Sequence, residues 1–147
     1  MDKELIQEKI NLITRDLNRL KQFSDERLED LVEDFIKYSA LKNILMETIG
    51  RAIDINSHII AKSSIKESPK NYRETFLFLG ELDVLPDDFS KEISKSAGFR
   101  NAIVHDYDEL DKIEIYKTVG DAIRQYRDYC EYILDYLEAD KNKKTNQ

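Results

Sequence analysis

Hydrophobic residues recur at helical spacing from the start of the chain. The first stripe steps by four, three, four and three positions and consists of Ile6, Ile10, Ile13, Leu17 and Leu20. On an α-helix, side chains at this spacing form one apolar face. The stripe repeats for only about two heptads, which is too short for a coiled coil. The pattern therefore predicts an amphipathic helix that packs by one face.

A second stripe predicts one long helix over residues 25–64. Its apolar members are Leu28, Leu31, Phe35, Tyr38, Leu45, Ile49 and Ile53. We expect Ser24 or Asp25 to be its N-cap, since short polar side chains accept hydrogen bonds from the first amides of a helix. Gly50 lies inside the stripe without changing its phase. We therefore expect the helix to continue through Gly50, which would allow another helix to approach closely.

Turn-forming residues divide the rest of the chain. Pro69 marks a loop in "SSIKESPKN", because the residue before proline is biased away from helical dihedral angles. A short helix is predicted over residues 71–82. Pro86 suits the first turn of a further helix, in which an acidic pair follows it. The last helix is predicted from near Asp111 to about Ala139, with a frayed polar tail after it.

Four long helices and one short helix, joined by short connections, predict an all-α antiparallel bundle. We expect residues 1–140 to form a single helical domain and residues 141–147 to form the tail. The composition agrees, with 41% hydrophobic and 36% charged residues but only four glycines and two prolines among 147 residues. Cys130 is the only cysteine and lies on the apolar stripe of the last helix. It is expected to be a small buried hydrophobe.

Composition also limits the class of protein. One cysteine excludes an intramolecular disulfide framework and, with two histidines, a zinc ribbon. The chain has no apolar run near the roughly eighteen residues of a membrane span, and its first residues do not resemble a signal peptide. We expect a cytoplasmic protein with no membrane contact. The net charge of −7 argues against a surface that coats nucleic acid, although it permits a local basic cleft.

Polar chemistry is concentrated in "RNAIVHDY", residues 100–107. Asn101 and His105 are four residues apart and share one face of a helix that we expect to end near His105. Arg100 is permanently cationic and can grip phosphate oxygens, while a histidine can transfer a proton near neutral pH. These groups suit phosphoryl transfer without a metal. The same residues could instead form a capping and ion-pair cluster beside acidic neighbours, and the residues alone leave both interpretations open.

Two further groups are ambiguous. Asp54 and His58 are four residues apart and could support the motif, or could form a hydrogen bond at the helix surface. No metal site is expected, because the histidines lack the HxxxH or HxxE spacing of metal ligands. The last helix carries five tyrosines, namely Tyr116, Tyr126, Tyr129, Tyr132 and Tyr136. They could stack RNA bases, but tyrosines on two faces of one helix favour a core plus a subunit interface.

"RNAIVHDY" matches the pattern Arg–x4–His–x–Tyr, and three longer segments accompany it in a characteristic order. These are "DINSHIIA" (54–61), "NYRETFLFLGELDVLP" (71–86) and "AGFRNAIVHDYDELD" (97–111). The motif and the segments together resemble the HepT-like HEPN-domain ribonuclease toxins, which are paired with minimal nucleotidyltransferase antitoxins. The resemblance covers most of the chain, roughly from Leu31 to Leu137.

The resemblance implies a dimeric helical toxin that cleaves RNA without a metal or cofactor, by attack of the ribose 2′-hydroxyl on the adjacent phosphate. Arg100 and His105 would be catalytic, with Asn101 in support. The partner would be a nucleotidyltransferase antitoxin that transfers AMP to Tyr107. The main alternative is a non-catalytic HEPN subunit that binds a nucleotide or docks the nucleotidyltransferase, and a third is a helical adaptor without a ligand. The intact Arg–x4–His pair favours the enzyme.

Overall fold

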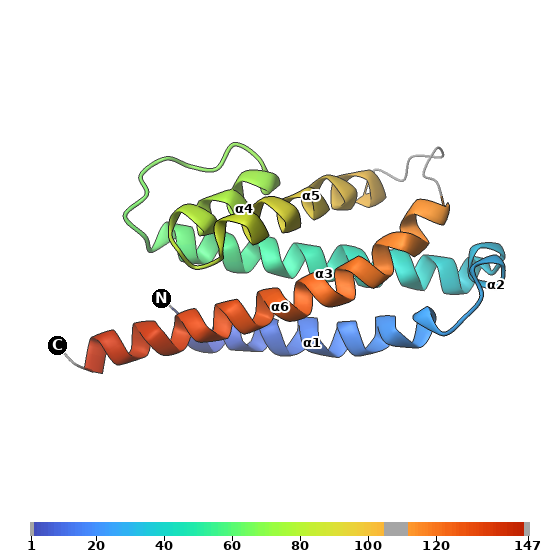
Figure 1. The fold of residues 1–147 in the computed structure, drawn as a ribbon, viewed down its shortest axis with the longest axis horizontal. Helices are drawn as coiled ribbons and strands as arrows, with labels where there is room; N and C mark the ends of the chain where they lie inside the picture. Colours follow the sequence, from blue (N-terminus) through green and yellow to red (C-terminus); the bar gives the residue numbers. More distant parts are fainter. Residues whose placement is uncertain (1, 105–111, 146–147) are drawn as a thin grey trace.

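The computed structural model describes residues 2–104 and 112–145, and their regular secondary structure is entirely α-helical. The helices are α1 (Lys3–Ser24), α2 (Leu28–Glu33), α3 (Phe35–Ala61), α4 (Tyr72–Glu81), α5 (Asp87–Val104) and α6 (Lys112–Thr145). The long helices α1, α3, α5 and α6 run alternately up and down the bundle, and both ends of the chain lie at the same end of it (Figure 1). The predicted all-α antiparallel bundle is confirmed.

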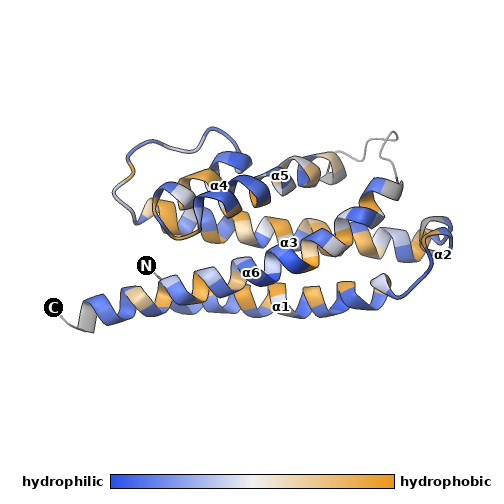
Figure 2. Cartoon of the chain, in the orientation of Figure 1, coloured by the Kyte–Doolittle hydropathy of each residue, from blue (hydrophilic) through white to orange (hydrophobic). Residues whose placement is uncertain are grey.

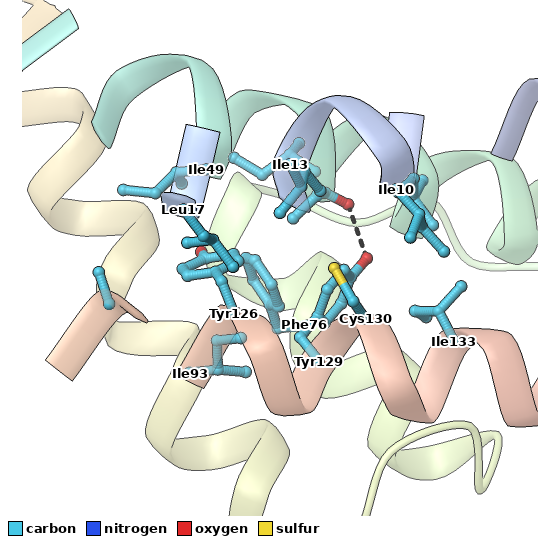
Figure 3. Packing of buried hydrophobic residues seen from close by; sticks show 14 of the residues in the cluster. Ile10, Ile13, Leu17, Ile49, Phe76, Ile93, Tyr126, Tyr129, Cys130 and Ile133 are labelled. Atoms are coloured by element: carbon cyan, nitrogen blue, oxygen red, sulfur yellow. Dashed lines mark hydrogen bonds between the residues drawn. The ribbon is translucent and has the colours of Figure 1, made fainter. Parts of the chain in front are cut away.

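The core lies where α1 packs against α3 and α6, while α4 and α5 cover another side of α3. Every member of the first predicted stripe is buried, from Ile6 to Leu20. Apolar and polar residues alternate around the long helices, as Figure 2 shows. Figure 3 shows Ile10, Ile13 and Leu17 of α1 beside Tyr126 and Cys130 of α6. Burial of a side chain as large as isoleucine stabilises the fold by about 1.5–3 kcal/mol relative to exposure.

The prediction of one helix over residues 25–64 was wrong at its start. Asp34 separates α2 from α3 with extended dihedral angles, φ −89° and ψ 104°. Its carboxylate accepts hydrogen bonds from the backbone N–H groups of Ile36 and Lys37, at 3.0 and 3.1 Å. Asp34 is thus the N-cap of α3 and satisfies amides that a continuous helix would have bonded internally.

The expected cap at Ser24 or Asp25 was also wrong. Asp25 is instead the C-cap of α1, and the hydroxyl of Ser24 donates to the carbonyl of Lys21 in that same helix. The N-cap of α2 is Arg27, which makes no side-chain capping bond. Ser24 and Asp25 therefore end α1, and α2 begins without a side-chain cap.

The other helices follow the sequence closely. α4 lies within the predicted residues 71–82, and α5 begins directly after Pro86. α6 continues to Thr145, beyond the predicted end at Ala139. Asp83, in the turn between α4 and α5, has a φ of 58°, a left-handed conformation that aspartate adopts more readily than most residues. None of the helices in the described residues is long and apolar enough to cross a membrane.

Gly80 determines how closely α4 and α5 approach each other. A Cβ atom at Gly80 would contact the hydroxyl of Ser90 and would lie 2.9 Å from the Ser90 Cβ. Real Cβ atoms essentially never come this close to another carbon, so the two helices could not keep their present spacing with any larger residue here. This close contact holds α5, and with it Arg100, against α4.

Candidate active site

The Arg100 side chain extends from α5 towards α3 and α4. Its guanidinium carbon lies 5.2 Å from the centre of the Tyr72 ring, at the start of α4. On α3, a Cβ atom at Gly50 would lie 3.5 Å from Arg100 Nε and 3.9 Å from Nη2. The expected close approach at Gly50 is therefore made by the Arg100 side chain. The guanidinium is held between an aromatic ring and a helix that lacks a side chain at the point of contact.

The Arg100 side chain lines a small hollow at the surface of the bundle. The hollow has a volume of about 180 Å³ and is lined by Met46, Glu47, Gly50, Arg51, Asp54 and Arg100. Arg100 Nε is buried and has no hydrogen-bond partner within residues 2–104 and 112–145. In the same part of the chain, no carboxylate forms an ion pair with Arg100. An arginine in this state can still receive an anion.

The second arginine of the hollow, Arg51, is already engaged. Its Nη1 forms an ion pair with the buried carboxylate of Asp16 on α1, and its Nη2 lies 3.4 Å from Glu47 Oε2. Asp16 also accepts from Arg15 and Arg19, each at 3.3 Å. Three arginines thus surround a single buried carboxylate. The hollow itself is lined by two arginines, Arg51 and Arg100, and by two carboxylates, Glu47 and Asp54.

The two residues that the sequence suggested as a supporting pair, Asp54 and His58, have different partners in the structure. Asp54 lines the hollow with Arg100, but its carboxylate is exposed and lies 3.4 Å from Lys9 Nζ. The Nε2 atom of His58 accepts a hydrogen bond from the backbone N–H of Asp2, at 3.2 Å. Each residue therefore has its own partner near the start of α1. Only Asp54 lies where it could act on a ligand held by Arg100.

The remaining motif residues are only partly described. Asn101 follows Arg100 on α5 and is exposed to solvent. His105 and Tyr107 lie outside the described residues, so their predicted roles stay predictions. No cluster of three or more His, Cys, Asp or Glu side chains suited to a metal occurs in the described part of the chain. Because His105 is not among those residues, metal independence also stays a prediction.

A buried polar network lies beneath Tyr72. The hydroxyl of Tyr129 on α6 donates to Asn56 Oδ1 on α3, at 2.6 Å. The Asn56 amide donates to the hydroxyl of Thr75 on α4, at 3.2 Å, and that hydroxyl donates to the backbone carbonyl of Tyr72, at 2.6 Å. Burial raises the pKa of Tyr129 well above its ordinary value, so the phenol remains a donor. The network connects the core to the residue that contacts Arg100.

Sequence reasoning missed Asn56, Thr75 and Tyr72. A signal for Asn56 existed, because it is a polar residue surrounded by Ala52, Ile53, Ile55, Ile59 and Ile60 on a buried helix. A polar side chain in such a position needs an internal partner. Tyr72 gave no such signal, since its contact with Arg100 depends on how α4 and α5 pack.

The tyrosines of α6 belong mainly to the core. Tyr126 and Tyr129 are completely buried, and Tyr132 packs edge-on against Phe89 with ring centres 5.0 Å apart. The core prediction is confirmed for Tyr126 and Tyr129, and base stacking on either ring is excluded. Cys130 is buried as expected, and burial raises the pKa of its thiol to about 12.

The described helices form an all-α bundle in which Arg100 lines a small hollow. The sequence model of the ribonuclease HepT-like family matches residues 13–133, and the chain belongs to this family. The tRNA nuclease HepT of Aphanizomenon flos-aquae is 34% identical over 133 residues, which are 90% of each chain. The mRNA nuclease HepT of Shewanella oneidensis is 26% identical over 93% of this chain and 98% of the relative. The family resemblance seen in the sequence is confirmed.

Solved structures show the same fold. The Shewanella oneidensis HEPN toxin, solved in a tri-AMPylated form in complex with an MNT antitoxin, superposes with a TM-score of 0.81. It is 24% identical and covers 92% of this chain and 99% of its own. YutE of Bacillus subtilis, a cytosolic protein of unknown function, has a TM-score of 0.78 and 20% identity, with 95% and 93% of the two chains covered. At these identities the likeness concerns the fold alone.

Proposed function

We propose that this protein is the toxin of a toxin–antitoxin pair and cleaves RNA without a metal ion. The observation that carries the proposal is the state of Arg100. Its guanidinium is fixed between Tyr72 and Gly50 and has no carboxylate partner in the described residues. Membership of the ribonuclease HepT-like family supports an RNA substrate, as do the names of the two nuclease relatives.

The proposed reaction uses a nucleophile from the substrate. The ribose 2′-hydroxyl attacks the adjacent phosphorus, and the bond from phosphorus to the 5′-oxygen breaks. The products are a 2′,3′-cyclic phosphate and a 5′-hydroxyl, and the proton lost by the 2′-hydroxyl is balanced by the proton that the 5′-oxygen gains. His105 acts as the base or the acid, and Arg100 stabilises the negative charge that develops on the phosphate oxygens. Asn101 supports this pair.

A homodimer would complete the proton transfers. The reaction needs both a base and an acid, whereas each chain offers one motif histidine. A two-fold interface could bring two copies of Arg100 and His105 to one cleft. The doubled positive charge would also attract RNA to an acidic protein. We therefore propose that the active form is a dimer.

The proposed partner is a minimal nucleotidyltransferase antitoxin that transfers AMP to Tyr107. The structure of the tri-AMPylated Shewanella oneidensis toxin with its MNT antitoxin supports this type of partnership. AMP on Tyr107, two residues after His105, would add bulk and negative charge where RNA phosphates must bind. Steric exclusion and repulsion between like charges would then block the substrate.

RNA cleavage in EDTA tests the proposal directly. The purified protein is incubated with end-labelled RNA in excess EDTA, beside Arg100→Ala and His105→Ala. We expect cleavage by the wild type, cyclic phosphate ends on the products, and no cleavage by either variant, with the helical circular dichroism of all three unchanged. Cleavage that requires magnesium, or that survives either substitution, would contradict the mechanism. A wild type that binds RNA or nucleotide but never cuts would support the non-catalytic HEPN subunit.

A further inference from the structure

Two arginines line the same hollow, but the protein holds them in opposite ways. The guanidinium of Arg51 is occupied by carboxylates, with Asp16 at Nη1 and Glu47 near Nη2. The guanidinium of Arg100 instead lies over the Tyr72 ring, 5.2 Å from its centre. A carboxylate would neutralise an arginine and occupy its N–H donors. An aromatic ring attracts the cation through its face and leaves the N–H groups in the guanidinium plane available.

Capping hydrogen bonds hold the backbone around Tyr72, although 45% of the residue is exposed. It is the first residue of α4, and the preceding Asn71 caps the helix by accepting from the N–H of Glu74, at 2.9 Å. The carboxylate of Glu74 reaches back to accept from the N–H of Lys70, at 2.6 Å. These two bonds fix the chain on either side of Tyr72, as a reciprocal cap does.

The backbone of Tyr72 is also tied to the core. Its carbonyl accepts from the hydroxyl of Thr75, which is held in turn by the buried amide of Asn56. Asn56 is bonded to the hydroxyl of Tyr129 in the centre of the bundle. The backbone from which the Tyr72 ring projects is therefore held by residues of three helices, α3, α4 and α6.

We propose that Tyr72 is a positioning residue for Arg100, which holds the guanidinium in the orientation that receives a substrate phosphate. The proposal rests on the proposed role of Arg100 and extends it to a residue outside the Arg–x4–His motif. Gly50 leaves space for the guanidinium beside its Nε atom, and Tyr72 supplies the attractive aromatic face. An arginine freed from the ring would sample other rotamers, and the nearest acidic side chains, Asp54 and Glu47, would compete for it.

The first test compares two substitutions that differ in the aromatic ring. Tyr72→Leu removes the ring, and we expect kcat/KM for RNA cleavage to fall about tenfold, through weaker phosphate binding as well as a lower kcat, because a misoriented guanidinium contacts the phosphate less well in both the bound state and the transition state. Tyr72→Phe keeps the ring and is expected to restore most of this loss. Equal activity of Tyr72→Leu and the wild type would overturn the proposal, as would an equal loss in Tyr72→Phe.

The second test asks whether the ring acts through Arg100. A 2′-fluoro version of an RNA that the wild type cleaves binds without reacting, and its Kd is measured for the wild type, Tyr72→Leu, Arg100→Ala and the double variant. We expect Tyr72→Leu to weaken binding in the wild-type background and to have no further effect once Arg100 is absent. An equal loss in both backgrounds would overturn the proposal, because the ring would then contact RNA itself.

The catalytic role of Arg100 and the positioning role of Tyr72 can be tested separately. If Arg100→Ala cleaves RNA as fast as the wild type, the catalytic role of Arg100 is wrong and the role of Tyr72 is wrong with it. If Arg100→Ala is inactive while Tyr72→Leu retains wild-type kcat/KM and Kd, only the positioning role is wrong. Circular dichroism and thermal unfolding of each variant show whether a loss of activity reflects a loss of the fold.

Discussion

Asp16 of α1 and Arg51 of α3 form an ion pair across the interface of the two helices, and the carboxylate is almost completely buried. Asp16→Asn keeps the shape of the side chain but leaves Arg51 without its buried partner. We expect the free energy of unfolding to fall by about 3 kcal/mol, at the lower end of the range for a broken buried pair, because Arg51 would keep only the exposed Glu47 as an ionic partner. Urea unfolding measures the change.

Arg19→Ala is the matched control for this prediction. Arg19 contacts the same carboxylate, at 3.3 Å, but its side chain is 53% exposed. Its loss should cost less than about 1 kcal/mol, as for other exposed ion pairs. Equal costs for Asp16→Asn and Arg19→Ala would show that burial of the Asp16–Arg51 pair does not determine its energy.

Gly80→Ala should destabilise the contact between α4 and α5. The added Cβ would lie 2.9 Å from the Ser90 Cβ, and overpacking of this kind costs about 1–3 kcal/mol. Gly120→Ala is the control, because nothing lies within 4 Å of a Cβ at that position in α6. It should stabilise the protein by up to about 1 kcal/mol through helix propensity alone.

A double-mutant cycle identifies the clash at Gly80. Ser90→Gly removes the atoms that the new Cβ would meet, so the cost of Gly80→Ala should shrink in that background. Thermal unfolding of the four proteins gives the coupling. If Gly80→Ala lowers the free energy of unfolding equally with and without the Ser90 side chain, the contact with Ser90 is not the source of the destabilisation.

The regular helices were predictable because their buried apolar residues recur at the helical period along the sequence. The stripe from Ile6 to Leu20 predicted α1, and Pro86 with the acidic residues after it predicted the start of α5. Helix periodicity does not detect a cap that interrupts a stripe, so the break at Asp34 was missed. Phe35 and Ile36 follow that break and are about four-fifths exposed. Phe35 was predicted to belong to an apolar face that the structure does not bury there.

The site was predictable only in part, for a different reason. The motif placed Arg100 on a helix, but the residues that hold Arg100 come from α3 and α4. Gly50 and Tyr72 meet Arg100 through the packing of three helices, and no spacing along the chain encodes that contact. The network of Asn56, Thr75 and Tyr129 is equally non-local. Polar residues on a buried face could have indicated that partners exist, but not which partners.

Substitutions at Gly50 distinguish the space that Arg100 needs from the conformational flexibility of glycine. The two substitutions to compare are Gly50→Ala and Gly50→Leu. A Cβ at Gly50 meets Arg100 Nε at 3.5 Å, an ordinary contact distance, so Gly50→Ala should stabilise α3 by about 0.5–1 kcal/mol and leave Arg100 in place. Leucine would displace the guanidinium, and the rate of RNA cleavage should fall about a hundredfold. A Gly50→Leu variant that is folded and fully active would refute the steric role of Gly50.

Stability should decrease in alkaline solution, because burial raises the pKa of Cys130, Tyr126 and Tyr129. The folded protein keeps these protons at a pH at which the unfolded chain releases them. The stabilisation is therefore complete below the ordinary thiol pKa, near 9, and is lost as the pH rises towards about 12. Urea unfolding from pH 8 to pH 11 measures it. Cys130→Ala should reduce the loss between pH 9 and 10, and an unchanged slope would exclude the thiol as a contributor.

Tyr107→Phe tests the proposed control by AMP. The variant lacks the phenol oxygen that would attack the α-phosphate of ATP, but keeps an aromatic ring two residues after His105. A phenol with a pKa near 10 is a weak nucleophile, so the transfer requires the nucleotidyltransferase and its metal-bound ATP. Co-expressed with that enzyme, the wild type should gain AMP on Tyr107, as intact mass and peptide mapping would show, and should stop cleaving RNA. Tyr107→Phe should remain unmodified at that position and active after the antitoxin is removed. A wild type that is silenced without AMP, and recovers when the two proteins separate, would show that the antitoxin acts by covering the site.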